Sequence, residues 1–264
     1  MSKPLVSVVM PAYNCAGTIR QAIDSVKKQK MDLEIIIIND CSKDELDTVM
    51  EAYRDDPVIF YVKNEKNIGA AASRNRGVAM ARAPFVAFLD TDDWWAEDKL
   101  KKQMDKLKKT GCVLCCTARE LVTPDGQLTG RVISVKERLT YRSLLTHNSI
   151  NCSSVLARTE VLRKFPMEYE QAHEDYVTWL KILQKYKTAC AVNEPLLKYR
   201  LTSTGKSGNK LVSAKKTFQV YRYMGFGLLK SAVCFCSYAL HGVLKYGGSV
   251  ISGRIGSHKS GQND

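Results

Sequence analysis

Short apolar runs and helix-like segments alternate along the first part of this 264-residue chain. Apolar runs without polar alternation are typical of strands covered on both faces, and an apolar period near 3.6 residues is typical of helices. We expect strands at Val6–Met10, Glu34–Ile38, Val58–Val62 and Phe85–Leu89, and helices at Thr18–Lys28, Asp44–Arg54, Gly69–Arg82 and Ala96–Lys109. This order predicts right-handed βαβ units and a mostly parallel sheet.

After Gly111 the pattern is more mixed. The sequence TPDG at 123–126 predicts a turn, and we expect a strand at Cys152–Ala157, a helix at Glu174–Tyr186 and a strand at Thr188–Val192. The predicted fold class is α/β, with a Rossmann-like nucleotide-binding half (1–110), a second half (111–200) and a mixed, mostly parallel sheet. In such sheets ligands bind beyond the carboxyl ends of the strands, where the strand order reverses.

Polar residues follow three of the predicted strands directly. Tyr13 comes after the first strand, Asp40 after the second, and the acids of FLDTDDWW (Asp90, Asp92 and Asp93) after the fourth. Because parallel strands end at the same edge of a sheet, we expect these side chains to share one rim. Three carboxylates at the end of a buried strand repel one another, so a positively charged ligand would stabilise them.

The net charge of +13 is concentrated at the C-terminal end. From Lys198 onward the chain has eleven Lys or Arg residues and a single acid, Asp264. The chain carries no recognised nucleic-acid-binding motif, so we expect no nucleic-acid partner.

The nine cysteines are an odd number without the spacing of a disulfide framework, and the N-terminus lacks the pattern of a signal peptide. Both observations favour a reducing, cytoplasmic compartment. Cys112, Cys115 and Cys116 have no second pair or nearby histidines to complete a zinc site, so we interpret them as buried strand cysteines.

Five segments occur in an order and at a spacing that resemble the family 2 glycosyltransferases of bacterial surface-polysaccharide assembly, which are inverting enzymes with the GT-A fold. The segments, which lie within residues 4–200, are VSVVMPAYN, EIIIINDCSKD, NIGAAASRNRG, FLDTDDWW and HEDYVTWL. One departure is NDCS, where many members have a second acid and a glycine, but Asp40 is retained. The resemblance implies transfer of a sugar from a nucleoside-diphosphate sugar, most simply a UDP-sugar, to a glycan or lipid-linked glycan.

The resemblance also implies a metal site in the acid cluster. It places a DxD motif at Asp90 and Asp92, with Asp93 beside it, to bind Mn²⁺ or Mg²⁺ and the ribose. Hard divalent cations prefer carboxylate oxygens and offset the charge of a departing diphosphate. The alternative is that these acids cap the helix that begins near Ala96.

Further residues are assigned to the nucleotide by the resemblance. Asp40 can accept a hydrogen bond from a uracil N3–H and Tyr13 can stack on the base, or Asp40 can form an Asx turn and Tyr13 be a half-buried core ring. The remaining members of the implied nucleotide-binding set are Pro11, Asn67, Gly69, Arg74 and Asp90. Asn67 and Gly69 precede a helix whose amides can face a phosphate, whereas Arg74 can equally be a solvated helix residue.

Inverting transfer needs a base that takes the proton of the attacking hydroxyl. The resemblance assigns this role to Asp175, with Glu174 adjacent on the acceptor side. Two acids at a helix N-terminus are also favoured by the helix dipole alone, which is the alternative. Trp94 and Trp95 suit either an acceptor wall or the core, and His173 and Trp179 suit supporting or core positions.

Residues 201–264 are expected to form a basic C-terminal extension. A helix over 215–245 would place Phe218, Tyr221, Leu228, Ala232, Phe235, Ala239 and Val243 on one face and Lys216, Gln219, Tyr223, Lys230, His241 and Lys245 on the other. The apolar face can lie on an anionic membrane, so that the enzyme is peripheral on the inner face of the cell membrane, or it can pack on the catalytic domain. We also expect a covering loop at 199–210 and a frayed tail over the last twelve residues.

Two other functions are compatible with parts of the sequence. A sugar nucleotidyltransferase would have a glycine-rich phosphate loop near the N-terminus, where PAYNCAGTIR offers only Gly17 and Arg20. A non-catalytic membrane-associated module that binds nucleotide-sugars would not need Asp40, Asp92 and Asp175 together.

Overall fold

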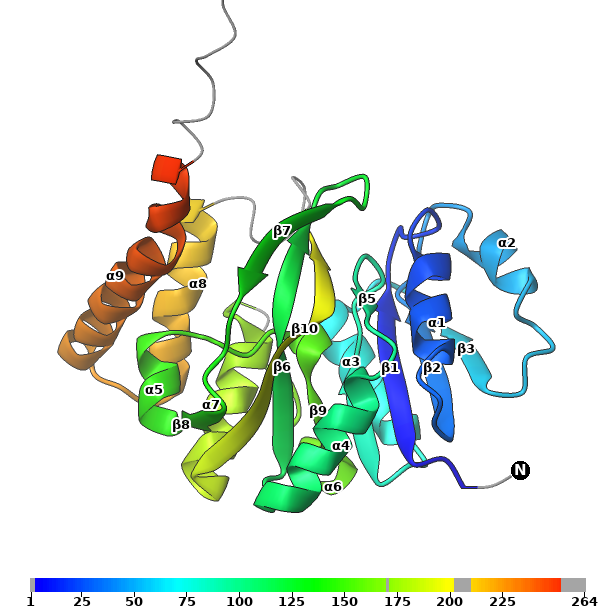
Figure 1. Ribbon diagram of the computed structural model, residues 1–264, viewed down its shortest axis with the longest axis horizontal. Coiled ribbons are helices and arrows are strands. Elements are labelled where there is room, and N and C mark those ends of the chain that lie inside the picture. The colour runs from blue at the N-terminus through cyan, green and yellow to red at the C-terminus, as the bar shows by residue number, and fades with distance from the viewer. Residues whose placement is uncertain (1–2, 170, 202–209, 253–264) are drawn as a thin grey trace, which may run out of the picture.

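The computed structural model describes residues 3–169, 171–201 and 210–252. The predicted tail and residues 202–209 of the predicted covering loop lie outside the described residues. A mixed sheet of ten strands within the described part runs through the centre of the molecule, with helices on both faces (Figure 1). This architecture is the predicted α/β class.

The strands are β1 (Val6–Ala12), β2 (Leu33–Asn39), β3 (Ile59–Lys63), β4 (Phe85–Phe88), β5 (Trp94–Trp95), β6 (Leu114–Val122), β7 (Leu128–Ile133), β8 (Arg138–Thr140), β9 (Leu156–Arg158) and β10 (Thr188–Arg200). The helices are α1 (Ile19–Lys27), α2 (Leu46–Glu51), α3 (Ala70–Met80), α4 (Lys99–Thr110), α5 (Tyr141–Thr146), α6 (Thr159–Lys164), α7 (Glu174–Tyr186), α8 (Lys210–Tyr223) and α9 (Leu228–Ser252), with a 3₁₀ turn η1 at Cys152–Ser154.

The sheet order is β3-β2-β1-β4-β9-β6-β10-β5, with β7 paired to β6 and β8 to β10. The first four strands in this order are mutually parallel, and β9 joins them to the parallel pair β6 and β10 through antiparallel contacts. The chain runs outward from β1 to β3 and then returns to place β4 on the other side of β1. The switch point therefore lies between the carboxyl ends of β1 and β4.

Neighbouring residues of the central strands point into two different cores. Val8, Ile35 and Ile37 pack with α1 and α4, whereas Val9 and Ile36 pack with the helices on the opposite face. All five side chains are at most 1% exposed. Burial on both faces explains why these strands read as continuous apolar runs.

The predicted strand at Cys152–Ala157 is wrong in its first half, where the chain forms η1 and enters β9 only at Leu156. Polar side chains favour the turn, because Asn151 Oδ1 accepts a hydrogen bond from the Ser153 amide and the Ser154 hydroxyl donates to the Asn151 carbonyl. The predicted strand at Thr188–Val192 continues to Arg200, through an irregularity between Val192 and Leu197.

The predicted single helix over 215–245 is also wrong. The chain breaks between α8 and α9 at Gly225, whose φ of 80° favours glycine, and the two helices pack side by side (Figure 1). The rings of Phe218 and Phe235 lie 6.2 Å apart in this contact, so these two residues face inward. Among the described residues, no helix combines the length and hydropathy needed to cross a bilayer.

Helix α8 packs into the same core as the central sheet. Val220 and Tyr221 are fully buried, and the Tyr221 hydroxyl donates a hydrogen bond of 2.8 Å to the Leu145 carbonyl. The packing alternative is therefore confirmed for α8. The two predicted halves also share one sheet, because β10 pairs with β5 of the first half.

Candidate active site

A cavity of about 890 Å³ lies at the carboxyl ends of β1, β2 and β4, at the switch point. Every residue assigned to the site from the sequence lines this cavity, except Asp93 and Asp175. Those lining it are Pro11, Tyr13, Asp40, Asn67, Gly69, Arg74, Asp90, Asp92 and Glu174. Residues separated by more than a hundred positions thus meet in one space.

Asp40 organises the loop that precedes α3. Its Oδ1 accepts hydrogen bonds from the Asn64 side chain and the Ile68 amide, and its Oδ2 accepts one from the Gly69 amide, all at 2.8 Å. A carboxylate oxygen can accept two hydrogen bonds, so Oδ2 retains capacity for one more donor. Asp40 is therefore more than the centre of a local Asx turn, because it holds a loop that lies 28 residues farther along the chain.

Tyr13 and Asn14 continue the rim beyond β1. Tyr13 is 45% exposed and belongs to neither apolar core, so its ring can stack on a flat ligand and is not a core ring. Asn14 has a φ of 49°, and its Oδ1 accepts a hydrogen bond of 2.8 Å from the Lys43 amide. This bond ties the loop after β1 to the loop after β2.

Arg74 joins two acids that come from different elements. Its guanidinium lies 2.6 Å from Asp90 Oδ1 and 3.5 Å from Glu174 Oε1, and its side chain is 8% exposed. A buried cation between two carboxylates reduces their mutual repulsion. Arg74 therefore holds the end of β4 against the start of α7 and is not a solvated helix residue.

Asp90 and Asp92 point into the same cavity. Burial, and next the charge of Asp90, raise the pKa of Asp92 to about 6. Within residues 3–169, 171–201 and 210–252, no group of three His, Cys, Asp or Glu side chains is arranged to hold a metal ion. The donor set still fits a hard divalent cation, because Mg²⁺ is commonly held by one or two carboxylates, with water and substrate phosphates as its other ligands.

Asp93 faces away from the cavity. It is 2% exposed, and its Oδ1 accepts a hydrogen bond of 2.9 Å from the Arg200 amide. Burial, followed by the charges of Asp92 and Asp90, raises the pKa of Asp93 well above its ordinary value. Asp93 thus anchors the acid loop to the end of β10.

Asp175 lies beside the cavity at the N-terminus of α7. Its side chain is half-buried, and its Oδ1 accepts a hydrogen bond of 2.7 Å from the Tyr176 amide. Burial, and next the charge of Glu174, raise the pKa of Asp175 to about 6. A carboxylate with this pKa is largely ionised at neutral pH and is basic enough to accept a proton.

Arg200 and Lys216 line the cavity but were missed in the sequence. The Arg200 side chain donates hydrogen bonds to the Asp92 carbonyl, the Pro124 carbonyl and Gln21 Oε1, at 2.7–2.8 Å. Because these three partners come from three distant segments, no pattern near Arg200 in the sequence predicts its position in the site. Lys216 was placed on the polar face of the extension, and only the packing of α8 brings it to the cavity.

The tryptophans and cysteines named from the sequence mostly have structural roles. Trp179 is fully buried, and Trp95 is 3% exposed with its ring nitrogen 2.8 Å from the Ser153 carbonyl. Cys115 and Cys116 are buried on β6, as predicted, whereas Cys112 precedes the strand and is only partly buried.

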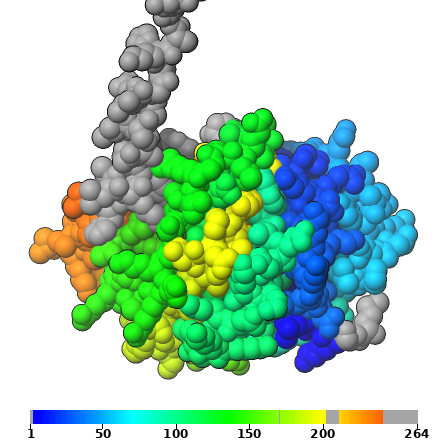
Figure 2. Space-filling model, in the orientation of Figure 1, coloured from blue at the N-terminus to red at the C-terminus, as the bar shows by residue number. Residues whose placement is uncertain are grey.

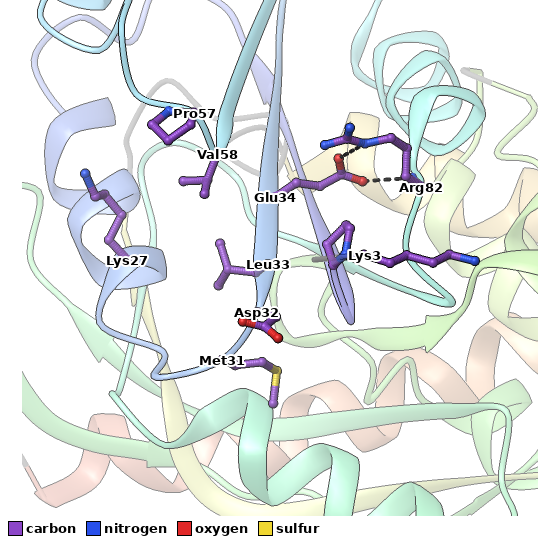
Figure 3. A pocket seen from close by; sticks show the side chains of 10 residues that line it. Lys3, Lys27, Met31, Asp32, Leu33, Glu34, Pro57, Val58 and Arg82 are labelled. Atoms are coloured by element: carbon purple, nitrogen blue, oxygen red, sulfur yellow. Dashed lines mark hydrogen bonds and ion pairs between the residues drawn. The ribbon is translucent and has the colours of Figure 1, made fainter. Parts of the chain in front are cut away.

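A second cavity, of about 670 Å³, lies at the amino ends of the strands, near the start of β2 (Figure 3). Three of its charged side chains, those of Lys27, Glu34 and Arg82, form ion pairs within the protein. Arg82 lies 2.7 Å from Glu34, and Lys27 lies 2.5 Å from Asp56. This cavity therefore offers no pair of neighbouring carboxylates comparable to Asp90 and Asp92.

Comparison with known proteins agrees with this geometry. Residues 7–165 match the model described as glycosyl transferase family 2. TuaG of Bacillus subtilis (strain 168), a glycosyltransferase whose name assigns it provisionally to teichuronic acid biosynthesis, is 37% identical over 246 residues, which are 92% of this chain and 98% of TuaG. WfaP of Escherichia coli, named UDP-Glc:alpha-D-GlcNAc-diphosphoundecaprenol beta-1,3-glucosyltransferase, is 30% identical over 243 residues, 92% of this chain and 95% of WfaP.

The fold is similar to that of a solved structure, the mannosyltransferase PcManGT from Pyrobaculum calidifontis in complex with GDP-Man and Mn²⁺. The TM-score is 0.68 at 16% sequence identity, and the match covers 96% of this chain and 80% of the other. This likeness confirms the predicted GT-A fold.

Proposed function

Because the chain belongs to glycosyl transferase family 2, we propose that it transfers a sugar from a UDP-linked donor to a lipid-linked glycan during bacterial surface-polysaccharide synthesis, with inversion at the anomeric carbon. One observation carries this proposal. Carboxylates from the ends of β2 and β4 and from the start of α7 line a single cavity at the switch point of the sheet.

The nucleotide would be held at the rim formed by the loops after β1 and β2. Tyr13 offers an exposed ring for stacking on the base, and Asp40 Oδ2 has capacity for one imide N–H. Gly69 and Asn67 line the adjacent wall at the start of α3, where backbone amides suit a phosphate. We favour uracil because a relative that is 30% identical over 92% of this chain is named for UDP-Glc.

Asp92 and Asp90 are the residues we propose for Mn²⁺ or Mg²⁺. When bound, the cation would offset the negative charge that builds on the departing diphosphate. Asp93 is left out of this set because it does not line the cavity and its Oδ1 accepts the hydrogen bond from the Arg200 amide.

Asp175 is the proposed base. The acceptor hydroxyl oxygen forms a bond to the anomeric carbon while the bond from that carbon to the diphosphate oxygen breaks. The hydroxyl proton passes to a carboxylate oxygen of Asp175, and the electron pair of the broken bond leaves with the nucleoside diphosphate. A single displacement of this kind inverts the anomeric centre.

The proposed acceptor sets the location. A lipid-linked sugar diphosphate, as in the name of the WfaP relative, is confined to a membrane, whereas nucleotide-sugars are soluble. We therefore propose that the enzyme is peripheral on the cytoplasmic face of the cell membrane.

Calorimetry with UDP tests the metal role. We expect Mn²⁺ to tighten UDP binding at least about tenfold in the natural chain and not in Asp92→Asn, since a charge-assisted contact contributes about 1.5–3 kcal/mol. Asp105→Asn, which alters an exposed acid of α4, is the matched control. If Mn²⁺ tightened the binding of UDP to Asp92→Asn as much as to the natural chain, Asp92 would be removed from the metal site, and equal UDP affinity of the natural chain with and without Mn²⁺ would remove the metal role.

A transfer assay tests the function itself. UDP-sugars are supplied together with N-acetylglucosamine linked through diphosphate to a short lipid, and the product anomer is determined by NMR. We expect a β-linked disaccharide from an α-linked donor. Retention of configuration, or no transfer from any nucleotide-sugar that stabilises the protein thermally, would contradict the proposal.

A further inference from the structure

Helix α9 presents its apolar side chains to solvent. Leu228, Leu229, Val233 and Leu240 are 69%, 81%, 62% and 60% exposed, whereas Ser231 on the same helix is fully buried. A helix on the surface of a protein in water normally has the reverse arrangement. We call these four exposed residues the outward α9 face.

The outward α9 face is a continuous stripe. Leu229, Val233 and Leu240 are spaced by four and seven residues, about one and two helical turns, which places them along one side of a helix. Leu228 widens the stripe at its start. Side chains of this kind, grouped on one face, mark an interaction surface more often than isolated exposed leucines do.

Contacts on the other side fix the orientation of α9. Phe235 packs 6.2 Å from Phe218 of α8, and Tyr238 packs 6.1 Å from Tyr176 of α7, measured between ring centroids. Rotation of α9 to bury Leu229 would break both contacts. The exposure is therefore a property of the packed domain.

Charge around this face has one sign. The chain contains no Asp or Glu between Glu194 and Asp264, and Lys230 and Arg222 are both exposed beside the start of α9. The described parts of α8 and α9 form the end of the molecule farthest from β3 (Figures 1 and 2). An apolar stripe on a stretch of chain whose charged side chains are all cations is complementary to a bilayer with anionic headgroups.

We propose that the outward α9 face docks on the surface of an anionic lipid bilayer, with Leu229, Val233 and Leu240 inserted at the headgroup level. The proposal deepens the proposed function and rests on it only for the reason to dock, namely a lipid-linked acceptor. Helix α8, which packs against both α9 and α7, carries Lys216 to the cavity. Docking through α9 would thus hold the cavity close to the lipid surface.

Co-sedimentation with vesicles tests the docking. The natural chain is mixed with vesicles of phosphatidylcholine alone or with one third phosphatidylglycerol, and compared with a Leu229→Ser, Val233→Ser, Leu240→Ser variant. We expect binding to the anionic vesicles only, and a loss of at least about tenfold in the variant, because each buried apolar side chain contributes measurably to partitioning. Leu128→Ser with Val132→Ser, which changes exposed apolar residues of β7, should bind like the natural chain.

Three outcomes would overturn the proposal. They are equal binding by the triple variant, no binding to anionic vesicles, and a natural dimer that becomes monomeric in the triple variant, which would assign the face to a second copy. Transfer to a water-soluble, short-lipid acceptor separates the two proposals. If vesicles bind but no sugar is transferred, the proposed function fails while the docking stands, and an active triple variant that no longer binds vesicles supports both.

Discussion

Asp175 is the residue whose replacement tests the chemistry most directly. We expect Asp175→Asn to lower kcat about 100-fold or more while the affinity for UDP stays unchanged, since a positioned base contributes about 10²–10⁴-fold and does not touch the nucleotide. Steady-state kinetics together with UDP calorimetry measure both quantities. Asp24→Asn, on the surface of α1, should leave both unchanged, and a fully active Asp175→Asn enzyme would remove the base assignment.

The same carboxylate predicts a pH dependence. A base acts only in its ionised form, and the pKa of Asp175 is raised to about 6 by burial and by Glu174. With Mn²⁺ at saturation, which keeps Asp92 ionised, we therefore expect kcat/KM to be constant above that pH and to fall about tenfold for each pH unit below it. The pH profile of the natural enzyme measures this limb, and a profile that stays flat down to pH 5 would contradict the assignment.

Lys216 allows a paired comparison with its neighbour. Lys216 lines the cavity from α8, whereas Lys215 is exposed to solvent. We expect Lys216→Ala to raise the KM for the donor about 10-fold or more, because a charge-assisted contact to phosphate contributes about 1.5–3 kcal/mol. Lys215→Ala should not change the KM, which initial-rate kinetics measure. If the two substitutions had equal effects, Lys216 would act only through the overall positive charge of this region and not through a contact with the donor.

At the residue scale, the sequence located the cavity better than it located the individual contacts. Tyr13, Asp40, Asp90 and Asp92 could be placed together because each follows a predicted parallel strand. That Asp93 turns away from its neighbours depends on the Arg200 amide, and no local pattern encodes a partner that far along the chain.

At the element scale, α3 lies unusually close to β1. A Cβ added at Gly77 would overlap the Cγ1 atom of Val9, a core residue with no exposed surface. We expect Gly77→Ala to lower the free energy of unfolding by about 1–3 kcal/mol through overpacking, less the helix propensity that alanine adds. Denaturant unfolding measures the change.

Gly17 provides the matched control for this substitution. A Cβ there meets no atom within 4 Å, so Gly17→Ala should leave stability nearly unchanged. If Gly77→Ala were as stable as the natural chain, the approach of α3 to β1 would be looser than described.

The elements that could be predicted share one physical feature. Their apolar residues either cover both faces of a strand or recur on one face of a helix. The βα units of the first half have it, and their order was correct. The C-terminal helices have it too, but the break at Gly225 shifts the register, so Phe218 and Phe235 turn toward each other and Leu228 turns outward. When a helical period is continued across a break in the chain, residues beyond the break are assigned to the wrong face of the helix, even if the period is regular.

At the scale of the whole molecule, the chain does not divide where its composition changes. The basic C-terminal quarter includes α8, whose Val220 lies in the same core as the sheet and whose buried Tyr221 packs 6.4 Å from the ring of Tyr176 of α7. Charge patterns report the surface, whereas domain boundaries depend on the buried face of each element. The likeness in fold to PcManGT, which extends over 96% of this chain, includes that quarter.

The hydrogen bond between Asp93 and the Arg200 amide has a consequence for protein synthesis. It spans 107 residues, so at about 5–20 residues per second the ribosome delivers Arg200 roughly 5 to 20 seconds after the acid loop. During that interval a nascent chain has β1 to β4 but lacks the anchor of its acid loop. Any contribution of the acid loop to binding the proposed donor nucleotide therefore begins only after Arg200 of β10 has left the ribosome.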